Sequence, residues 1–238
     1  MFRVGSGGYD IALTLFNPQG RLQQLEYAHR VIDRGLPIIG VTYKEGIVIG
    51  AAKVESKLID KRKFHKVFAI DEHIAVAFVG MSSDARVLID NLRTQCQMYR
   101  LTYDKPPSPY EISNELAQLL HIYTMYAGIR PFGVVLLIGG VYGNEKQLIY
   151  LTPDGSSKVF KAWGAGMGGA EIRDLLEKEY NENMTLLEAY DLIKRGIERS
   201  LDKKISPDSL EFAIIPVKTK KVEIIYGNEL INRLEKRD

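Results

Sequence analysis

The chain has 238 residues, and its 45% hydrophobic and 26% charged residues are ordinary for a globular domain with a real core. Its 32 basic and 30 acidic side chains give a net charge of +2, which excludes a protein that relies on phosphate neutralisation, so no nucleic acid partner is expected. The single cysteine, Cys96, excludes an internal disulfide and a cysteine-based zinc site and fits a reducing, cytoplasmic compartment.

Neither a membrane span nor a signal peptide is predicted. The longest apolar run, residues 132–142, contains three glycines and is far shorter than the roughly 20 residues that a spanning helix requires. The first ten residues have no apolar signal core, and three of the first eight are glycine. We therefore expect a flexible, exposed N-terminal tail and no membrane partner.

The first half of the chain predicts a helix followed by four antiparallel strands. A turn over residues 17–20, with Pro18 at its second position, precedes near-helical apolar spacing over 21–34, and Gly35 is a normal stop. Two pairs of β-rich runs then flank short turns. These predicted strands are residues 37–43, 46–52, 66–70 and 74–79.

Beyond residue 80, helices and strands alternate in blocks. The expected elements are helices at 83–101 and 110–126, strands at 133–141, 147–151 and 158–163, helices at 170–180 and 186–201, and strands at 211–217 and 221–226 before a short C-terminal helix. Thr185 and Glu188 form a capping box for the helix at 186–201. Strands in antiparallel blocks and helices in pairs predict an α+β protein with two facing sheets between helix layers.

A glycine-rich turn offers one candidate for cofactor chemistry. Residues 164–169 match G-x-G-x-x-G between a predicted strand and a predicted helix, as in dinucleotide-binding proteins. The next element is another helix and not the parallel strand that completes such a site. The pattern therefore favours a tight strand-to-helix turn with close packing, and no cofactor is expected.

Other polar groups give weak signals. The four histidines lack the spacing of metal ligands, so no metal is expected, and His73 is predicted in a turn. Ser83 or Asp84 is expected to cap the following helix. Residues 53–66 carry six basic and two acidic side chains, which suits an acidic partner group as well as a solvated loop.

Long stretches of the sequence resemble the proteasome α subunits. Residues 9–28, YDIALTLFNPQGRLQQLEYA, closely resemble the signature that opens this family, and similarity continues through residues 80–90, 128–133 and 176–180. The undecorated length resembles the archaeal type. The resemblance covers the whole chain and implies a four-layer αββα sandwich of the N-terminal nucleophile hydrolase type, with an extra N-terminal helix.

The resemblance also implies one α-type domain over residues 1–238. Within it, residues 1–20 would form the flexible gate tail and turn, 21–34 the N-terminal helix, and 36–238 the sandwich. Related β subunits cleave peptides with an N-terminal threonine. Here Leu36 falls at the position of that threonine and Ala52 at that of an acidic partner. A non-catalytic subunit is therefore expected.

For function, the resemblance implies a seven-membered ring of identical chains that caps the β subunits, gates the passage of unfolded protein substrates, and docks the C-terminal tails of ATPase-type activators. Residues that match each role are the gate cluster Tyr9, Asp10, Pro18 and Tyr27, the pore loop Tyr126, Ala127, Gly128 and Ile129, and the activator pocket Gly35, Lys66 and Met81. Ile11 replaces the usual arginine, so a salt bridge between tails is not available there.

Two alternatives remain open from the sequence. An active N-terminal nucleophile hydrolase would need processing that exposes Thr, Ser or Cys, which the Gly35-Leu36 step opposes. A dinucleotide-dependent enzyme would use residues 164–169, which the following helix pair opposes. Thermal-shift measurements with dinucleotides test this second alternative.

Overall fold

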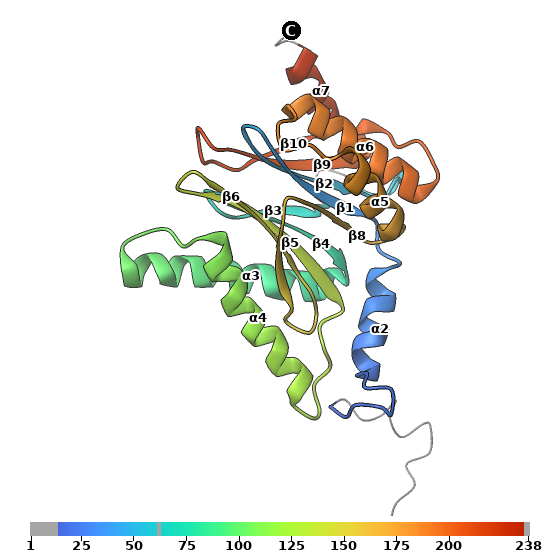
Figure 1. Ribbon diagram of the computed structural model, residues 1–238, viewed down its shortest axis with the longest axis vertical. Helices are drawn as coiled ribbons and strands as arrows, with labels where there is room; N and C mark the ends of the chain where they lie inside the picture. Colours follow the sequence, from blue (N-terminus) through green and yellow to red (C-terminus); the bar gives the residue numbers. More distant parts are fainter. Residues whose placement is uncertain (1–13, 61–62, 236–238) are drawn as a thin grey trace, which may run out of the picture.

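A computed structural model describes residues 14–60 and 63–235. Two five-stranded antiparallel sheets lie face to face, with helices on both outer sides, as Figure 1 shows. The first sheet has the order β10-β9-β2-β1-β8 and contains β1 (Ile38–Tyr43), β2 (Gly46–Ala52), β8 (Ala162–Ala165), β9 (Leu210–Pro216) and β10 (Glu223–Tyr226). The second has the order β3-β4-β5-β6-β7 and contains β3 (Val67–Asp71), β4 (Ile74–Gly80), β5 (Val134–Tyr142), β6 (Glu145–Leu151) and β7 (Ser157–Phe160).

The helices form the two outer layers and one end of the molecule. The elements are α2 (Gln23–Ile32), α3 (Ser82–Tyr103), α4 (Pro109–Met125), α5 (Gly169–Glu179), α6 (Leu186–Leu201), the 3-10 turn η1 (Pro207–Ser209) and α7 (Gly227–Glu235). Helices α3 and α4 cover the second sheet, α5 and α6 cover the first, and α2 stands at one end (Figure 1). The predicted αββα sandwich with an N-terminal helix is confirmed. In the described part of the chain, no helix combines the length and the apolar character needed to cross a membrane.

Alternating side chains fill three apolar layers, which explains the nearly continuous hydrophobic runs. Along β4, Ala75, Ala77 and Val79 point between the sheets, whereas Val76 and Phe78 point to α3 and α4. A strand buried on both faces has no polar side, so its sequence reads as an unbroken apolar run. The buried faces therefore fix the register of the strands.

Close approach of the two sheets explains one glycine on β1. A Cβ at Gly40 would lie 2.8 Å from Leu137 Cδ2 and 2.8 Å from Leu148 Cδ1, both from the facing sheet. Any larger residue would have to push the layers apart, and well-packed interiors resist such a change.

The strand predicted at 158–163 is wrong in one respect, because the chain changes sheets within it. Residues up to Phe160 pair with β6 in the second sheet, and residues from Ala162 pair with β1 in the first. Between them, the Lys161 carbonyl accepts a 2.7 Å hydrogen bond from the Thr42 amide. The sequence contains no glycine or proline at this crossing, so local turn chemistry does not mark it.

Helix starts were predicted with mixed success. The capping box of Thr185 and Glu188 is present at α6, and a second one, Ser108 with Glu111, starts α4. The predicted cap at Ser83 or Asp84 is wrong, because Met81 occupies the N-cap without a side-chain hydrogen bond. Asp84 instead binds a distant arginine, as described below.

Candidate functional site

The position expected for a nucleophile, at the start of β1, carries an aliphatic side chain. Leu36 connects α2 to β1 and packs against the core under α5 and α6. Its carbonyl oxygen accepts a 2.7 Å hydrogen bond from Lys66 Nζ. Ala52, at the end of β2, is fully buried. Neither side chain has an atom that can attack a carbonyl or accept a proton.

A buried group of charges lies beside Leu36 and includes Lys66. The Glu211 carboxylate, at the start of β9, has no exposed surface. Its Oε2 accepts hydrogen bonds from the Lys66 amide at 2.8 Å and the Val67 amide at 3.1 Å. Its Oε1 lies 2.6 Å from His65 Nδ1 and 3.7 Å from Lys53 Nζ. We call Lys53, His65, Lys66 and Glu211 the buried charge cluster; of the four, only the His65 side chain, 38% exposed, reaches water.

Burial changes the acid–base chemistry of the lysine in this cluster. Loss of water lowers the pKa of Lys66 from 10.5 to about 7, and the nearby Glu211 charge acts in the opposite direction. The ammonium also lies 5.7 Å from the centre of the Phe78 ring. The charge of Lys66 therefore depends on its surroundings. An incoming carboxylate would favour the protonated form of the amine.

The three residues predicted for the activator pocket lie around the end of β4. A Cβ on Gly35 would lie 2.4 Å from Val79 Cγ1 and 3.2 Å from the Gly80 amide nitrogen. Met81 follows Gly80 directly and is 39% exposed, whereas Lys66 is only 5% exposed. Lys66 reaches the carbonyl of Leu36, the residue next to Gly35. The fold therefore brings Gly35, Lys66 and Met81 together from three separate segments.

Half of the predicted gate cluster can be located. Tyr9 and Asp10, together with Ile11 and the tail, lie outside the described residues. Pro18 lies in a turn closed by a 2.8 Å hydrogen bond from the Gly20 amide to the Asn17 carbonyl. Tyr27 lies on α2, with the Arg30 guanidinium 5.4 Å from its ring centre.

The predicted pore loop leaves the end of α4 and is exposed. Tyr126 is 62% exposed, and Gly128 has a φ of +91°, which other residues rarely adopt. The next residue after Ile129 anchors the loop: Arg130 donates to both carboxylate oxygens of Asp84 at 2.7 and 2.8 Å. Asp84 also accepts from the Gly133 amide at 2.9 Å. The arginine holds the pKa of the Asp84 carboxyl below its usual value.

Comparison with known proteins identifies the family of the chain. The family described as proteasome subunit matches residues 32–215, and the N-terminal signature of the A-type proteasome subunits matches residues 9–30. The chain belongs to the proteasome α-subunit family.

Relatives named as proteasome α subunits match nearly the full chain. The one from Methanocaldococcus jannaschii is 38% identical over 99% of this chain and 90% of its own. The one from Thermococcus sibiricus is 40% identical over 96% of this chain and 87% of its own. The one from Archaeoglobus fulgidus is 39% identical over 94% of this chain and 91% of its own.

Within this proteasome α-subunit fold, the glycine-rich turn has a packing role, as predicted. A Cβ on Gly166 would lie 2.8 Å from the Gly35 carbonyl oxygen, and one on Gly168 would lie 2.6 Å from the Ser200 carbonyl oxygen. The Met167 amide donates to the Gly35 carbonyl at 2.8 Å. Helix α6 follows α5 where a dinucleotide site needs a strand.

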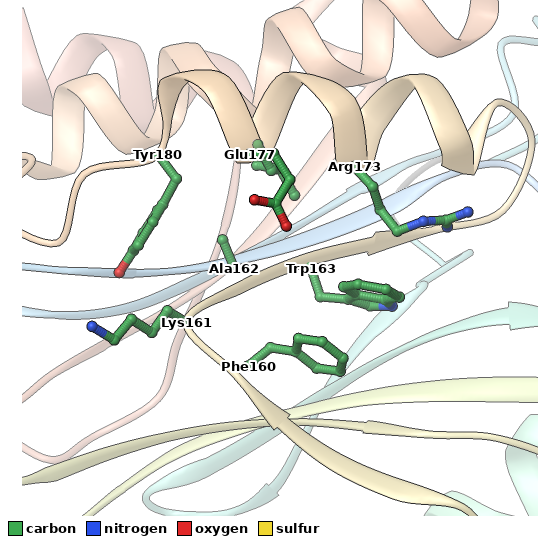
Figure 2. Close-up of a pocket in the computed structure, with 8 residues that line it drawn as sticks. Phe160, Lys161, Ala162, Trp163, Arg173, Glu177 and Tyr180 are labelled. Carbon is green, nitrogen blue, oxygen red and sulfur yellow. The ribbon is translucent and has the colours of Figure 1, made fainter.

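A cavity of about 240 Å³ lies between β8 and α5, next to the point where the chain changes sheets (Figure 2). The Phe160 and Trp163 rings stack with centres 4.1 Å apart, and the Arg173 guanidinium lies 5.2 Å from the Trp163 ring. Lys161 forms an ion pair with Glu182 at 2.7 Å. Of the predicted site residues that the structure describes, none lines this cavity. Its contacts are those of a packed crossing between layers.

Glu211 was missed by sequence reasoning, although a signal was present. It is the one acid in the apolar run LEFAII, and an acid in a strand buried on both faces needs partners. The Arg130–Asp84 pair was missed because its members are 46 residues apart. Nothing in either local pattern identifies the partner.

Proposed function

We propose that this α subunit of the proteasome core is non-catalytic and forms a cytoplasmic seven-membered ring of identical chains that caps the β subunits. The whole chain acts as a single domain in this proposal. The ring gates the passage of unfolded proteins and docks the C-terminal tails of ATPase-type activators. The observation that carries the proposal is Leu36, an aliphatic residue at the nucleophile position whose carbonyl is bound by Lys66. The lysine therefore binds a backbone carbonyl, and residue 36 has no nucleophilic side chain that it could assist.

Activity measurements on the separate and combined subunits test the absence of catalysis. The purified chain is expected to hydrolyse no peptides alone, and the mixture with its β partner is expected to hydrolyse them. Negative-stain images of both samples test for the ring. Hydrolysis that survives repurification, and is lost when a residue of this chain is mutated, contradicts the proposal.

Docking at Lys66 is supported by its position beside Gly35 and Met81 and by its charge. A carboxylate that enters this partly dry site would gain strongly from the ammonium, and removing one partner of such a pair costs about 2–5 kcal/mol. Lys66→Met keeps the length and apolar packing of the side chain and removes the charge.

The docking test compares two lysines three residues apart. Lys66→Met is expected to reduce the ratio of activator-stimulated to unstimulated degradation by more than tenfold. Lys63→Met is the matched control, because the Lys63 side chain is 86% exposed and its ion pair with Asp60 spans 3.9 Å. An unchanged ratio in Lys66→Met particles contradicts docking at this lysine.

Gating by the N-terminal residues is tested by truncation. Removing residues 1–8 is expected to raise degradation of an unfolded protein by assembled particles without activator, and to leave ring assembly intact. Because Ile11 replaces the usual arginine, the wild-type rate should depend little on salt. Equal rates for the two particles show that the tail is not the barrier, and steep salt activation of the wild type shows an ionic gate.

A further inference from the structure

The Glu211 carboxylate links the two sheets beside Lys66, the residue that precedes β3. Glu211 belongs to β9 in the first sheet, whereas the two amides that it accepts from start β3 at the edge of the second sheet. Lys66 and Glu211 are 145 residues apart in the sequence. One fully buried carboxylate therefore fixes the main chain of the segment that carries Lys66. Charged hydrogen bonds of this kind are strong in a dry interior.

The place of the Lys66 ammonium depends on that main-chain position. Its Nζ lies 2.7 Å from the Leu36 carbonyl oxygen and over the Phe78 ring, so the side chain connects the segment to the residues before β1 and to β4. Among the described residues, the charge that acts on this ammonium is Glu211 from β9. Lys53, after β2, and His65 in turn face the Glu211 carboxylate. The Lys53 ammonium in turn lies 4.7 Å from the centre of the Tyr226 ring of β10.

We propose that Glu211 is a positioning residue for activator docking: its carboxylate holds the start of β3 so that the Lys66 ammonium meets an incoming C-terminal carboxylate. This inference rests on the proposed function, because it needs Lys66 to be the docking lysine. Glu211 itself touches no activator, since its side chain has no exposed surface.

The same carboxylate also affects the range of pH over which docking works. Burial lowers the pKa of Lys66 to about 7, and the Glu211 charge opposes that effect. Below this value the lysine is cationic and attracts a carboxylate; above it, the attraction is lost by about tenfold for each pH unit. Removing the Glu211 charge should therefore move the loss of docking to lower pH.

The experiment measures binding of two peptides to assembled particles between pH 5.5 and 9. Both have the C-terminal ten residues of a proteasomal ATPase; one ends in a free α-carboxylate and the other in a carboxamide. The ratio of their affinities isolates the contribution of the carboxylate. Wild type, Glu211→Gln, Glu211→Asp and Lys66→Met are compared, with Glu198→Gln as the control. Glu198 is also an acid of low exposure that accepts from a backbone amide and faces a lysine, but on α6.

The expected result is a selective change. In wild type the carboxylate preference is at least tenfold at pH 6 and declines above about pH 7; Lys66→Met removes it at every pH. Glu211→Gln should move the midpoint of the decline about one unit lower and leave carboxamide binding within twofold of wild type. Glu211→Asp keeps the charge but draws it back from the Lys66 and Val67 amides, so it should lower the carboxylate preference at pH 6 at least threefold and move the midpoint by less than half as much. Glu198→Gln should not move it.

Failure of the inference can be distinguished from failure of the proposed function. A wild-type particle without carboxylate preference, or a preference that survives Lys66→Met, refutes docking at Lys66 itself. A preference that depends on Lys66 but keeps its wild-type size at pH 6 in both Glu211 variants refutes the positioning role alone, whether or not the midpoint moves. Equal weakening of both peptides in the Glu211 variants also refutes it, because it shows a merely structural effect. If Glu211→Gln does not assemble, Glu211→Asp decides between these outcomes.

Discussion

Two buried carboxylates, Glu211 and Asp84, both bind backbone amides and a basic side chain, but in different surroundings. Asp84 accepts from one backbone amide and from the Arg130 guanidinium, whose side chain is 54% exposed to water. Glu211 accepts from two backbone amides and faces Lys53, whose side chain is 1% exposed. The first pair has a solvated side that reduces the cost of burial, whereas the Glu211–Lys53 pair is dry and only the neighbouring His65 side chain, 38% exposed, reaches water. A buried charge with no access to water depends entirely on its protein partners.

The largest expected effect comes from removing the charge of Glu211 in the dry Glu211–Lys53 pair. Glu211→Gln should lower the free energy of unfolding by about 3–5 kcal/mol, because Lys53 loses its buried counter-charge. Urea denaturation of the purified chain measures this, with Glu198→Gln expected to cost less than about 1 kcal/mol. A cost below about 1 kcal/mol for Glu211→Gln would show that the Glu211–Lys53 pair is not dry in solution.

The stability of the wild type relative to Lys66→Met should change with pH. In the folded chain the pKa of Lys66 is about 7, against 10.5 for the free group. Between these values the unfolded chain binds a proton that the folded chain does not, so stability rises with pH by up to about 1.4 kcal/mol per unit. The variant lacks this gain. Denaturation of both chains from pH 6.5 to 10 measures the difference, and parallel curves would contradict a buried lysine.

A smaller effect is expected at the solvated pair. Asp84→Asn should cost about 1–2 kcal/mol at neutral pH, because the amide cannot accept both guanidinium hydrogen bonds. The pKa of Asp84 is lowered in the folded chain, so its contribution is full above the ordinary value and is lost as the pH falls through the lowered one. Wild type and variant should therefore converge in strong acid; a constant difference down to about pH 2 would contradict this.

The smallest expected effect is a difference between the two sites in how the cost of substitution depends on salt. Raising the ionic strength to 1 M shortens the screening length to about 3 Å, which weakens pairs in contact with water. The cost of Asp84→Asn should shrink by a few tenths of a kcal/mol, roughly the scale of an exposed pair. The cost of Glu211→Gln should stay constant. Equal salt dependence at the two sites would remove the distinction between them.

Local patterns in the sequence were enough to locate most of the elements and to arrange them in layers. The apolar runs at 37–43 and 46–52 became β1 and β2, and the helix at 186–201 begins with its predicted capping box. These features depend on neighbours within a few residues or on burial of whole faces, which leave a repeating pattern in the chain. The family resemblance added Gly35, Lys66 and Met81, which no spacing indicated.

The partners of the polar groups, in contrast, could be identified only in the folded chain. In the folded chain Asp84 pairs with Arg130 and does not cap a helix. The strand near Lys161 is divided between two sheets. Glu211 accepts hydrogen bonds from the amides of Lys66 and Val67. These partners are distant in sequence, so no local preference distinguishes them from any other acid, base or strand. A buried polar group must find a partner, but which partner it finds depends on how the layers stack.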